Sequence, residues 1–277
     1  MKENTKVSVI TIAYNNLEGL KLTAASIFAQ TCRDFEFIVV DGGSSDGSRQ
    51  WLEEHTNKID WWCSEPDNGI YSAMNKGIAQ AHGEYCIFMN SGDCFYDQHV
   101  LSKALPLLNG KDFYTGHQQN VGPHKRFIKA RQRIAIQLIA TRAISHQATF
   151  IKRSMLVARP YNEKYRIVSD WEQMLVEFSL HNASYEALPF TVSIFDTTGI
   201  SHQMLNTNFY QQEMRQVQED VFCPRVLDLI LGTDQLEGKV MSAMSYDDKL
   251  TRDFKILRNV LKALPRDLYH KLISYTK

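Results

Sequence analysis

VSVITIAY, residues Val7 to Tyr14, is apolar almost throughout and rich in β-branched side chains. This pattern is typical of a strand that is buried on both faces, as the central strands of a parallel sheet are. Apolar side chains at helical spacing follow from Leu17 to Gln30, and a second buried strand is expected from Phe35 to Val40. A strand, a crossover helix and a parallel strand form a βαβ unit, so the sequence predicts an α/β fold.

The same alternation of strand and helix continues to residue 93. The expected elements are a helix from about Arg49 to His55, a strand around Trp61 to Ser64, a helix after Gly69 and a strand from Glu84 to Met89. We interpret Asp67 as the N-cap of the third helix, because Asp side chains accept hydrogen bonds from the first helical N–H groups. The alternation predicts a doubly wound, mostly parallel sheet flanked by helices.

Beyond residue 93 the pattern is weaker. We expect a helix near Gln98 to Leu108, strands at Phe113 to Gly116, Ala148 to Ile151 and Tyr185 to Phe195, and a helix from Ser169 to Leu180. The basic polar stretch from His124 to Arg133 is interpreted as a mobile loop, and the chain is expected to be largely helical from about Asn206.

Composition excludes several classes of protein. The chain has 31 Lys/Arg and 31 Asp/Glu, so its formal net charge of zero argues against a dedicated nucleic-acid binder. Its 44% hydrophobic residues are ordinary for a globular protein, and the start of the chain has no apolar run long enough for a signal peptide or a spanning helix. Five cysteines without a CxxC pair indicate a reducing compartment, so we expect a cytoplasmic protein.

The C-terminal tail carries a concentrated positive charge. Residues 249–277 contain eight Lys/Arg and two Asp/Glu, a net charge of +6, which leaves 23 and 29 and a net charge of −6 for the first 248 residues. Apolar residues recur at helical spacing in this tail, at Leu250, Phe254, Leu257, Leu261 and Leu264. Two interpretations stay open: a basic amphipathic helix on an anionic membrane surface, or a helix packed on the rest of the protein.

Three acidic loops follow three of the expected parallel strands, at Asp41, Asp67 and Asp93. The carboxyl ends of parallel strands lie at one edge of a sheet, where ligands of such sheets bind. A single Asp in a Gly/Ser turn usually caps its own backbone, but three together favour a site. Carboxylates repel a diphosphate unless a divalent cation lies between them, so we predict a metal site anchored by Asp93 beside the small Gly92.

Four segments together resemble a known family. They are residues Val7 to Asn16, Asp41 to Ser48 (DGGSSDGS), Asp67 to Gly77 (DNGIYSAMNKG) and Asn90 to Asp93 (NSGD). Their order and spacing are similar to the motifs of family 2 glycosyltransferases with the GT-A fold. The resemblance covers residues 5–95 well and continues weakly to about 205.

The resemblance implies a role for each segment. The strand end from Thr11 to Tyr14, with Asp41 and Gly43, would hold the nucleoside of a sugar donor, and Asp67 with Gly69 would lie beside its base or ribose. Asp93 would be the metal-binding end of an Asp-x-Asp motif, next to Gly92. The sequence departs from the motif at Ser91, where the family has a carboxylate, and the implied cofactor is Mn²⁺ or Mg²⁺.

The resemblance also implies a catalytic base at a helix start about 70 to 100 residues after the metal motif. Asp170 fits this position, with Glu172 as the second candidate, although a helix-start carboxylate also interacts favourably with the helix dipole. A carboxylate that removes the acceptor proton typically contributes about 10² to 10⁴-fold to the rate. The loop from Asp196 to Ser201 would close over the donor, His202 would reach the diphosphate or the metal, and His146 would lie on the acceptor side.

These features predict an inverting transferase that moves a hexosyl or N-acetylhexosaminyl group from a nucleotide-diphosphate sugar, a UDP-sugar by resemblance, to a saccharide acceptor. The implied acceptor is a bacterial surface polysaccharide growing on a lipid diphosphate carrier, which would place the protein at the inner face of the cell membrane. The expected domains are a glycosyltransferase domain at 1–205, with a donor half at 1–95 and an acceptor half at 96–205, and a helical extension at 206–277.

Other nucleotide-binding proteins fit the sequence less well. A sugar-phosphate nucleotidyltransferase would carry a Gly-rich basic loop after the first strand, and a nicotinamide-dependent dehydrogenase would carry GxGxxG there. Residues 14–18 read YNNLE and have neither feature. A non-catalytic nucleotide-sugar-binding protein stays open as an alternative, although Asp170 at a helix start speaks against it.

Overall fold

The structure is a computed structural model that describes residues 5–199, 204, 207–224, 226–227 and 230–232. The chain divides into two compact units, Met1–Val221 and Phe222–Lys277. His202 and the basic tail from residue 249 lie outside the described residues, and the expected division at residue 205 stays a prediction. Among the described residues, no helix is long and apolar enough to cross a membrane.

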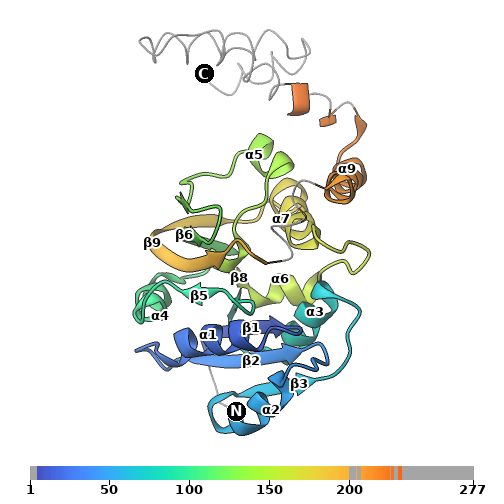
Figure 1. The fold of residues 1–277 in the computed structure, drawn as a ribbon. Helices are drawn as coiled ribbons and strands as arrows, with labels where there is room; N and C mark the ends of the chain where they lie inside the picture. The colour runs from blue at the N-terminus through green and yellow to red at the C-terminus, as the bar shows by residue number, and fades with distance from the viewer. Residues whose placement is uncertain (1–4, 200–203, 205–206, 225, 228–229, 233–277) are drawn as a thin grey trace. The chain divides into compact units, whose positions relative to one another are not determined.

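The first half of the sheet is parallel, as the sequence predicted. Strands β1 (Val7–Ala13), β2 (Phe35–Asp41), β3 (Trp61–Ser64) and β4 (Tyr85–Phe88) lie in the order β3-β2-β1-β4. Every residue of β2 and β4 is buried, as expected of inner strands of a sheet. Helix α1 (Leu17–Phe28) lies against β1 in Figure 1. All four carboxyl ends therefore point to one edge of the sheet.

The helices of this half are α1 (Leu17–Phe28), α2 (Ser48–Glu54), η1 (Thr56–Lys58) and α3 (Ile70–Gln80). Helix α3 packs closely on β1, since a Cβ atom on Gly77 would lie 2.5 Å from Ile10 Cγ2. The N-cap prediction for Asp67 is wrong: Gly69 occupies that position with a φ of 118°. Asp67 Oδ1 instead accepts a hydrogen bond from the Gly69 N–H at 2.8 Å, which stabilises the turn before the helix.

The second half of the sheet is mixed. Strand β8 (Thr149–Lys152) pairs antiparallel with β4, followed by β6 (Phe113–Val121), β9 (Tyr185–Asp196) and β5 (Cys94–Phe95), while β7 (Arg126–Ile128) pairs with β6. Strands β6 and β9 are parallel, so four of the described strand pairs are parallel and four antiparallel. The α/β class is confirmed, with its parallel strands concentrated in the first half.

The remaining helices are α4 (Val100–Ala104), η2 (Leu105–Leu107), α5 (Ile136–Thr141), η3 (His146–Ala148), α6 (Arg153–Ala158), α7 (Ser169–Leu180) and α9 (Asn208–Val221). The Trp171 indole of α7 donates to the Ile139 carbonyl of α5 at 2.6 Å. The stretch 124–133, which we interpreted as a mobile loop, contains a short strand that the sequence did not predict, because Arg126–Ile128 form β7. Pairing with this short strand also explains why β6 extends five residues beyond Gly116, to Val121.

Candidate active site

A cavity of about 1760 Å³ opens at the carboxyl ends of β1 and β4. Residues from both halves of the sheet line it, as do residues of the turns and helices that follow the strands. Its volume exceeds the roughly 300 to 1,000 Å³ of a typical small-molecule pocket. The cavity therefore has room for two substrates at once.

The turn from Asn90 to Asp93 forms one wall of the cavity, and helix α1 fixes its shape. The buried Thr23 hydroxyl donates to the Asp93 carbonyl at 2.7 Å and accepts from the Gly92 N–H at 3.0 Å. Gly92 has a φ of 104°, a backbone conformation that suits glycine. Ser91 lines the cavity, and its hydroxyl lies 3.1 Å from Asn16 Nδ2.

Asp93 lies deep in this wall, with 5% of its surface exposed. Its Oδ1 accepts a hydrogen bond from the Asp196 N–H at 3.2 Å. Burial raises the pKa of Asp93 to about 7, although the charge of His146 and the Asp196 N–H act in the opposite direction. Asp93 is thus a carboxylate whose ionised form would be favoured by a bound cation.

Asp93 and Asp196 fit a divalent cation that also binds substrate oxygens. Mg²⁺ and similar ions typically take one or two protein carboxylates together with phosphate oxygens and water. Asp196 lines the cavity beside Asp93, and its carboxylate accepts from the Thr198 N–H at 2.9 Å and the Thr198 hydroxyl at 2.8 Å. The described residues contain no group of three or more His, Cys, Asp or Glu that could hold a metal alone, so substrate oxygens would have to complete the shell.

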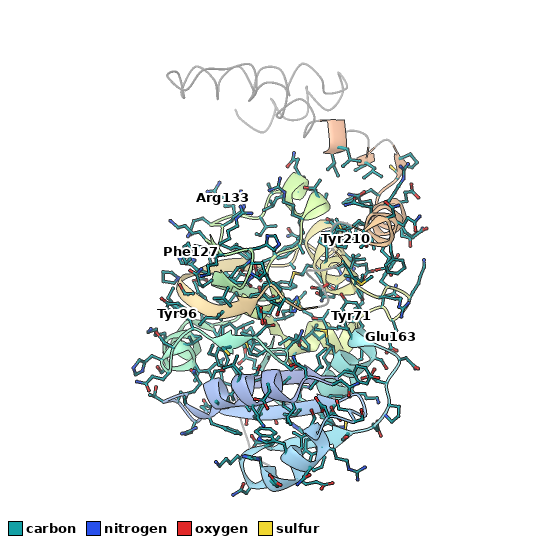
Figure 2. The ribbon with its side chains drawn as sticks, viewed as in Figure 1. Tyr71, Tyr96, Phe127, Arg133, Glu163 and Tyr210 are labelled. Atoms are coloured by element: carbon teal, nitrogen blue, oxygen red, sulfur yellow. The ribbon has the colours of Figure 1, made fainter. Side chains whose placement is uncertain are left out.

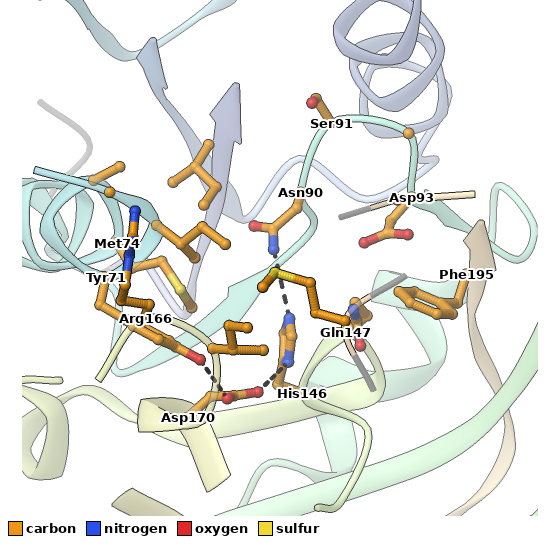
Figure 3. Close-up of a pocket in the computed structure, with 18 of the residues that line it drawn as sticks. Tyr71, Met74, Asn90, Ser91, Asp93, His146, Gln147, Arg166, Asp170 and Phe195 are labelled. Carbon is orange, nitrogen blue, oxygen red and sulfur yellow. Dashed lines mark hydrogen bonds and ion pairs between the residues drawn. The ribbon is translucent and has the colours of Figure 1, made fainter. Parts of the chain in front are cut away.

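On the opposite wall, Asp170 is held by two hydrogen-bond donors (Figure 3). The Tyr71 hydroxyl donates to its Oδ1 at 2.7 Å, and Nδ1 of His146 lies 2.6 Å from its Oδ2. Burial opposes ionisation of Asp170, but the His146 charge and both hydrogen bonds hold the pKa of its carboxyl below the usual value. In the same pair, burial opposes protonation of His146, but Asp170 raises the pKa of the imidazole.

His146 also reaches the metal-side wall. Its Nε2 lies 3.5 Å from the Asn90 side-chain amide nitrogen, while Asn90 Oδ1 is buried without a hydrogen-bond partner. Because the carboxylate of Asp170 accepts, His146 carries a hydrogen on Nδ1, and its Nε2 faces the Asn90 side chain. One imidazole thus connects the Asn90–Asp93 turn with Asp170.

The residues predicted to bind the sugar donor fall into two groups in the structure, those that line the cavity and those that do not. Tyr14, Gly43, Asp67 and Gly69 line the cavity, whereas Thr11 and Asp41 do not. Asp41 is fully buried and accepts from the Ser44 N–H at 3.0 Å, the Ser64 hydroxyl at 2.7 Å and the Ser44 hydroxyl. The Thr11 hydroxyl donates to the Met89 carbonyl at 2.7 Å. Both side chains are thus hydrogen-bonded within the walls of the cavity, and their predicted roles in donor binding stay predictions.

Close backbone approach shapes the donor side. A Cβ atom on Gly42 would lie 2.6 Å from Asp67 Oδ2, and Gly43 has a φ of 81°. The Tyr14 ring stands beside them with 63% of its surface exposed. The exposed Tyr14 ring beside these glycines suits a nucleobase, because bases stack on exposed aromatic faces.

Glu172, the second candidate for the base, does not line the cavity. Its Oε1 accepts from Arg159 Nη1 at 3.0 Å, within a cluster that also contains Glu177. This ion pair accounts for the buried charge of Glu172 without a catalytic role. Of the two carboxylates at the start of α7, only Asp170 lines the cavity.

Helix α9 contributes a wall that the sequence did not predict. Phe209 and Tyr210 line the cavity, and the buried Glu213 accepts from the N–H groups of Arg166 at 2.7 Å and Ile167 at 3.0 Å. Glu213 thereby holds the loop that precedes Asp170. Tyr71, the other missed residue, lies within the DNGIYSAMNKG segment, but its contact with Asp170 spans 99 positions and leaves no local signal.

Comparison with known proteins agrees with this arrangement. The family model described as glycosyl transferase family 2 matches residues 8–216. The uncharacterized glycosyltransferase MT1564 of Mycobacterium tuberculosis (strain CDC 1551 / Oshkosh) is 35% identical over 220 residues, covering 71% of this chain and 78% of that protein.

Two solved structures show the same fold. TarS of S. aureus (residues 1–349, in complex with UDP-GlcNAc) has a TM-score of 0.63 and 18% identity, covering 94% of this chain and 82% of that one. The mannosyltransferase PcManGT of Pyrobaculum calidifontis, in complex with GDP-Man and Mn²⁺, has a TM-score of 0.55 and 14% identity, with 98% and 84% covered. The match of family, relative and fold leads to one assignment: this chain belongs to glycosyl transferase family 2 and has the GT-A fold that its motifs predicted.

Proposed function

We propose that the protein transfers a hexosyl or N-acetylhexosaminyl group from a nucleotide-diphosphate sugar to a saccharide hydroxyl, with inversion at the anomeric carbon. One observation carries the proposal: the turn with Asp93 and the hydrogen-bonded Asp170 face the same cavity from opposite walls. In a single displacement the nucleophile attacks opposite the leaving group. The position of Asp93, which would bind the metal, across the cavity from Asp170, which would accept the proton, suits that geometry.

The donor would bind between Tyr14, the backbone at Gly43 and Asp67, with its diphosphate toward Asp93. We favour a UDP-sugar by resemblance, and the TarS structure was determined with UDP-GlcNAc. The cofactor would be Mn²⁺ or Mg²⁺, in line with the Mn²⁺ in the PcManGT structure. Asp93 and Asp196 would hold it, and the bound ion would offset charge on the departing nucleoside diphosphate.

Asp170 would act as the general base. Its low pKa keeps the carboxylate ionised at neutral pH, so it can accept the proton of the acceptor hydroxyl. That oxygen would form its bond to the anomeric carbon as the bond to the diphosphate oxygen breaks, and the proton would stay on Asp170 until product release. Tyr71 and His146 would hold the carboxylate in one orientation throughout.

The acceptor would be a saccharide of a growing bacterial surface polysaccharide on a lipid diphosphate carrier, which would bring the protein to the inner face of the cell membrane. Residues 249–277 would contribute a peripheral membrane contact, supported by their net charge of +6.

A thermal-shift panel of nucleoside diphosphates and nucleotide sugars, with and without Mn²⁺, tests the donor proposal. A ligand at about 100 times its Kd should stabilise the protein by roughly 2.7 kcal/mol. We expect one base to be preferred and Mn²⁺ to strengthen its effect. If no member of the panel raises the melting temperature, the donor site is refuted.

A further inference from the structure

One long part of the chain is basic without any acidic residue. From Phe113 to Asn162 the sequence has nine Lys/Arg and no Asp/Glu, although the whole protein has 31 of each. The nine are Lys125, Arg126, Lys129, Arg131, Arg133, Arg142, Lys152, Arg153 and Arg159. Six of them fall within residues 124–142, which we call the basic edge.

The six cations of the basic edge are exposed and are not used for internal contacts. None of them makes an ion pair or a side-chain hydrogen bond with a residue that the structure describes. Arg159 differs, since its guanidinium contacts both Glu172 and Glu177. Like charges held close together repel one another, and none of these six forms an ion pair among the described residues that would offset the repulsion. Their concentration points to an anionic partner.

Apolar side chains stand between these cations. Phe127 is 51% exposed and Ile136 is 37% exposed. Figure 2 shows Phe127 and Arg133 on the same edge of the molecule. Exposed apolar side chains among cations suit the boundary between headgroups and acyl chains of a membrane.

The basic edge is held in place by the sheet and by α7. Strand β7 pairs with β6, the Ala130 N–H donates to His117 Nδ1 at 3.1 Å, and the Tyr185 hydroxyl donates to the Arg131 carbonyl at 2.9 Å. Helix α5 is anchored through Ile139, whose carbonyl accepts from Trp171. The exposed cations and rings are therefore presented from a fixed backbone.

This surface also borders the cavity. Lys125, Arg126 and Ile128 line it at one end of the basic edge, and Ile144 lines it just beyond the other end. A sugar on a lipid carrier would emerge from a membrane beneath this surface next to the cavity mouth. The site and the surface thus fit one arrangement of the substrate.

We propose that the basic edge docks the protein on an anionic membrane surface, with its cations among lipid phosphates and Phe127 and Ile136 inserted at the interface. The identity of the lipid-borne acceptor rests on the proposed function, but the docking itself does not. Each cation near such a surface contributes roughly fivefold to partitioning, so removal of three should reduce it about a hundredfold.

The test uses the full chain and flotation with vesicles of phosphatidylcholine, with and without phosphatidylglycerol. One variant combines K129Q, R131Q and R133Q, and a second combines F127S and I136S; none of these residues lines the cavity. The matched control, R49Q with K58Q and K103Q, removes the same charge from α2, η1 and α4. The melting temperature of every variant reports on its folding, and the rise in melting temperature with UDP and Mn²⁺ reports on its donor site.

We expect the wild type to bind vesicles only when they contain phosphatidylglycerol. Vesicle binding should fall about a hundredfold in the triple variant and roughly tenfold or more in the double variant. The control variant should bind as the wild type does. Absence of binding to anionic vesicles, or an equal loss in the control, would overturn the proposal. A second combination of results would also overturn the proposal: the double variant binds vesicles as well as wild type does, and heparin captures the wild type but not the triple variant. The surface would then recognise a soluble polyanion. Loss of the UDP response in wild-type protein would instead count against the proposed function.

Discussion

His146 is the side chain on which the geometry of the site most depends. Its Nδ1 holds Asp170 at 2.6 Å, and its Nε2 faces Asn90 at 3.5 Å. The short contact is charge-assisted and therefore the stronger of the two, so orientation of Asp170 should dominate. Loss of that contact would leave the carboxylate with the Tyr71 hydroxyl and the Trp171 backbone N–H.

Substitution at His146 separates the two contacts. In H146N an amide nitrogen at the position of Nδ1 can still donate to Asp170, whereas the longer H146Q side chain places its amide at the position of Nε2, facing Asn90. We expect H146N to keep most of the turnover and H146Q to lose it roughly 10- to 100-fold at unchanged donor affinity. Steady-state kinetics with donor binding by calorimetry would measure this. Equal losses in both variants would show that the imidazole contributes more than a hydrogen bond to Asp170.

Asp93 should make metal binding depend on pH. With its pKa raised to about 7, a growing fraction of Asp93 is protonated as the pH falls below that value, and a proton competes with the cation. We predict that Mn²⁺ affinity measured by calorimetry falls by roughly tenfold per pH unit below about 7 and is constant above it. D93N provides the control, since its weak residual binding should not follow this profile.

The sequence identified much of the site because its motifs are local. Asp93 follows β4 directly, and Asp170 lies at a helix start, so both could be predicted from spacing. Tyr71 and Asp196 were missed as partners of these carboxylates because each contact joins residues about 100 positions apart. The donor-binding roles of Asp41 and Thr11 stay predictions, because adjacency to a strand end does not distinguish a side chain that faces the ligand from one that orders the wall.

Among the elements, the parallel strands were predictable and the mixed ones were not. Strands β1, β2 and β4 are rich in buried apolar residues, which is the pattern that the sequence analysis used to predict them. The positions of β6, β8 and β9 were expected, but their order in the sheet depends on pairings between distant strands. The short β7 has three residues of exposed or half-buried character, so periodicity gave no signal for it.

Helix α9 should support the loop before Asp170 through Glu213. The substitution E213Q keeps an acceptor oxygen but removes the charge that binds two backbone N–H groups, at a cost of about 1 to 3 kcal/mol in the free energy of unfolding. Denaturant unfolding should detect it. The matched control is E219Q on the same helix, whose exposed ion pair with Arg215 is screened by solvent, so its loss should leave the stability nearly unchanged. Similar effects in both variants would contradict the assigned role.

Over the whole molecule, two basic regions are candidates for membrane contact: the basic edge and the tail from residue 249. Their contributions should be separable in the full chain. If the tail contacts the membrane, replacing Lys255, Arg258 and Lys262 with Gln should lower association with anionic vesicles by roughly a hundredfold. Association unchanged by this variant would favour the alternative, in which the tail is a helix packed on the protein.

The central claim is that Asp93 and Asp170 perform separate tasks across one cavity, donor binding through a metal and proton removal from the acceptor. The most direct test measures Mn²⁺-dependent donor binding and sugar transfer in parallel for wild type, D93N and D170N. The account predicts that D93N loses the Mn²⁺-dependent part of donor affinity, while D170N binds donor normally and transfers at less than a tenth of the wild-type rate. Transfer by D170N above that level, or Mn²⁺-dependent donor binding that survives in D93N, would contradict it.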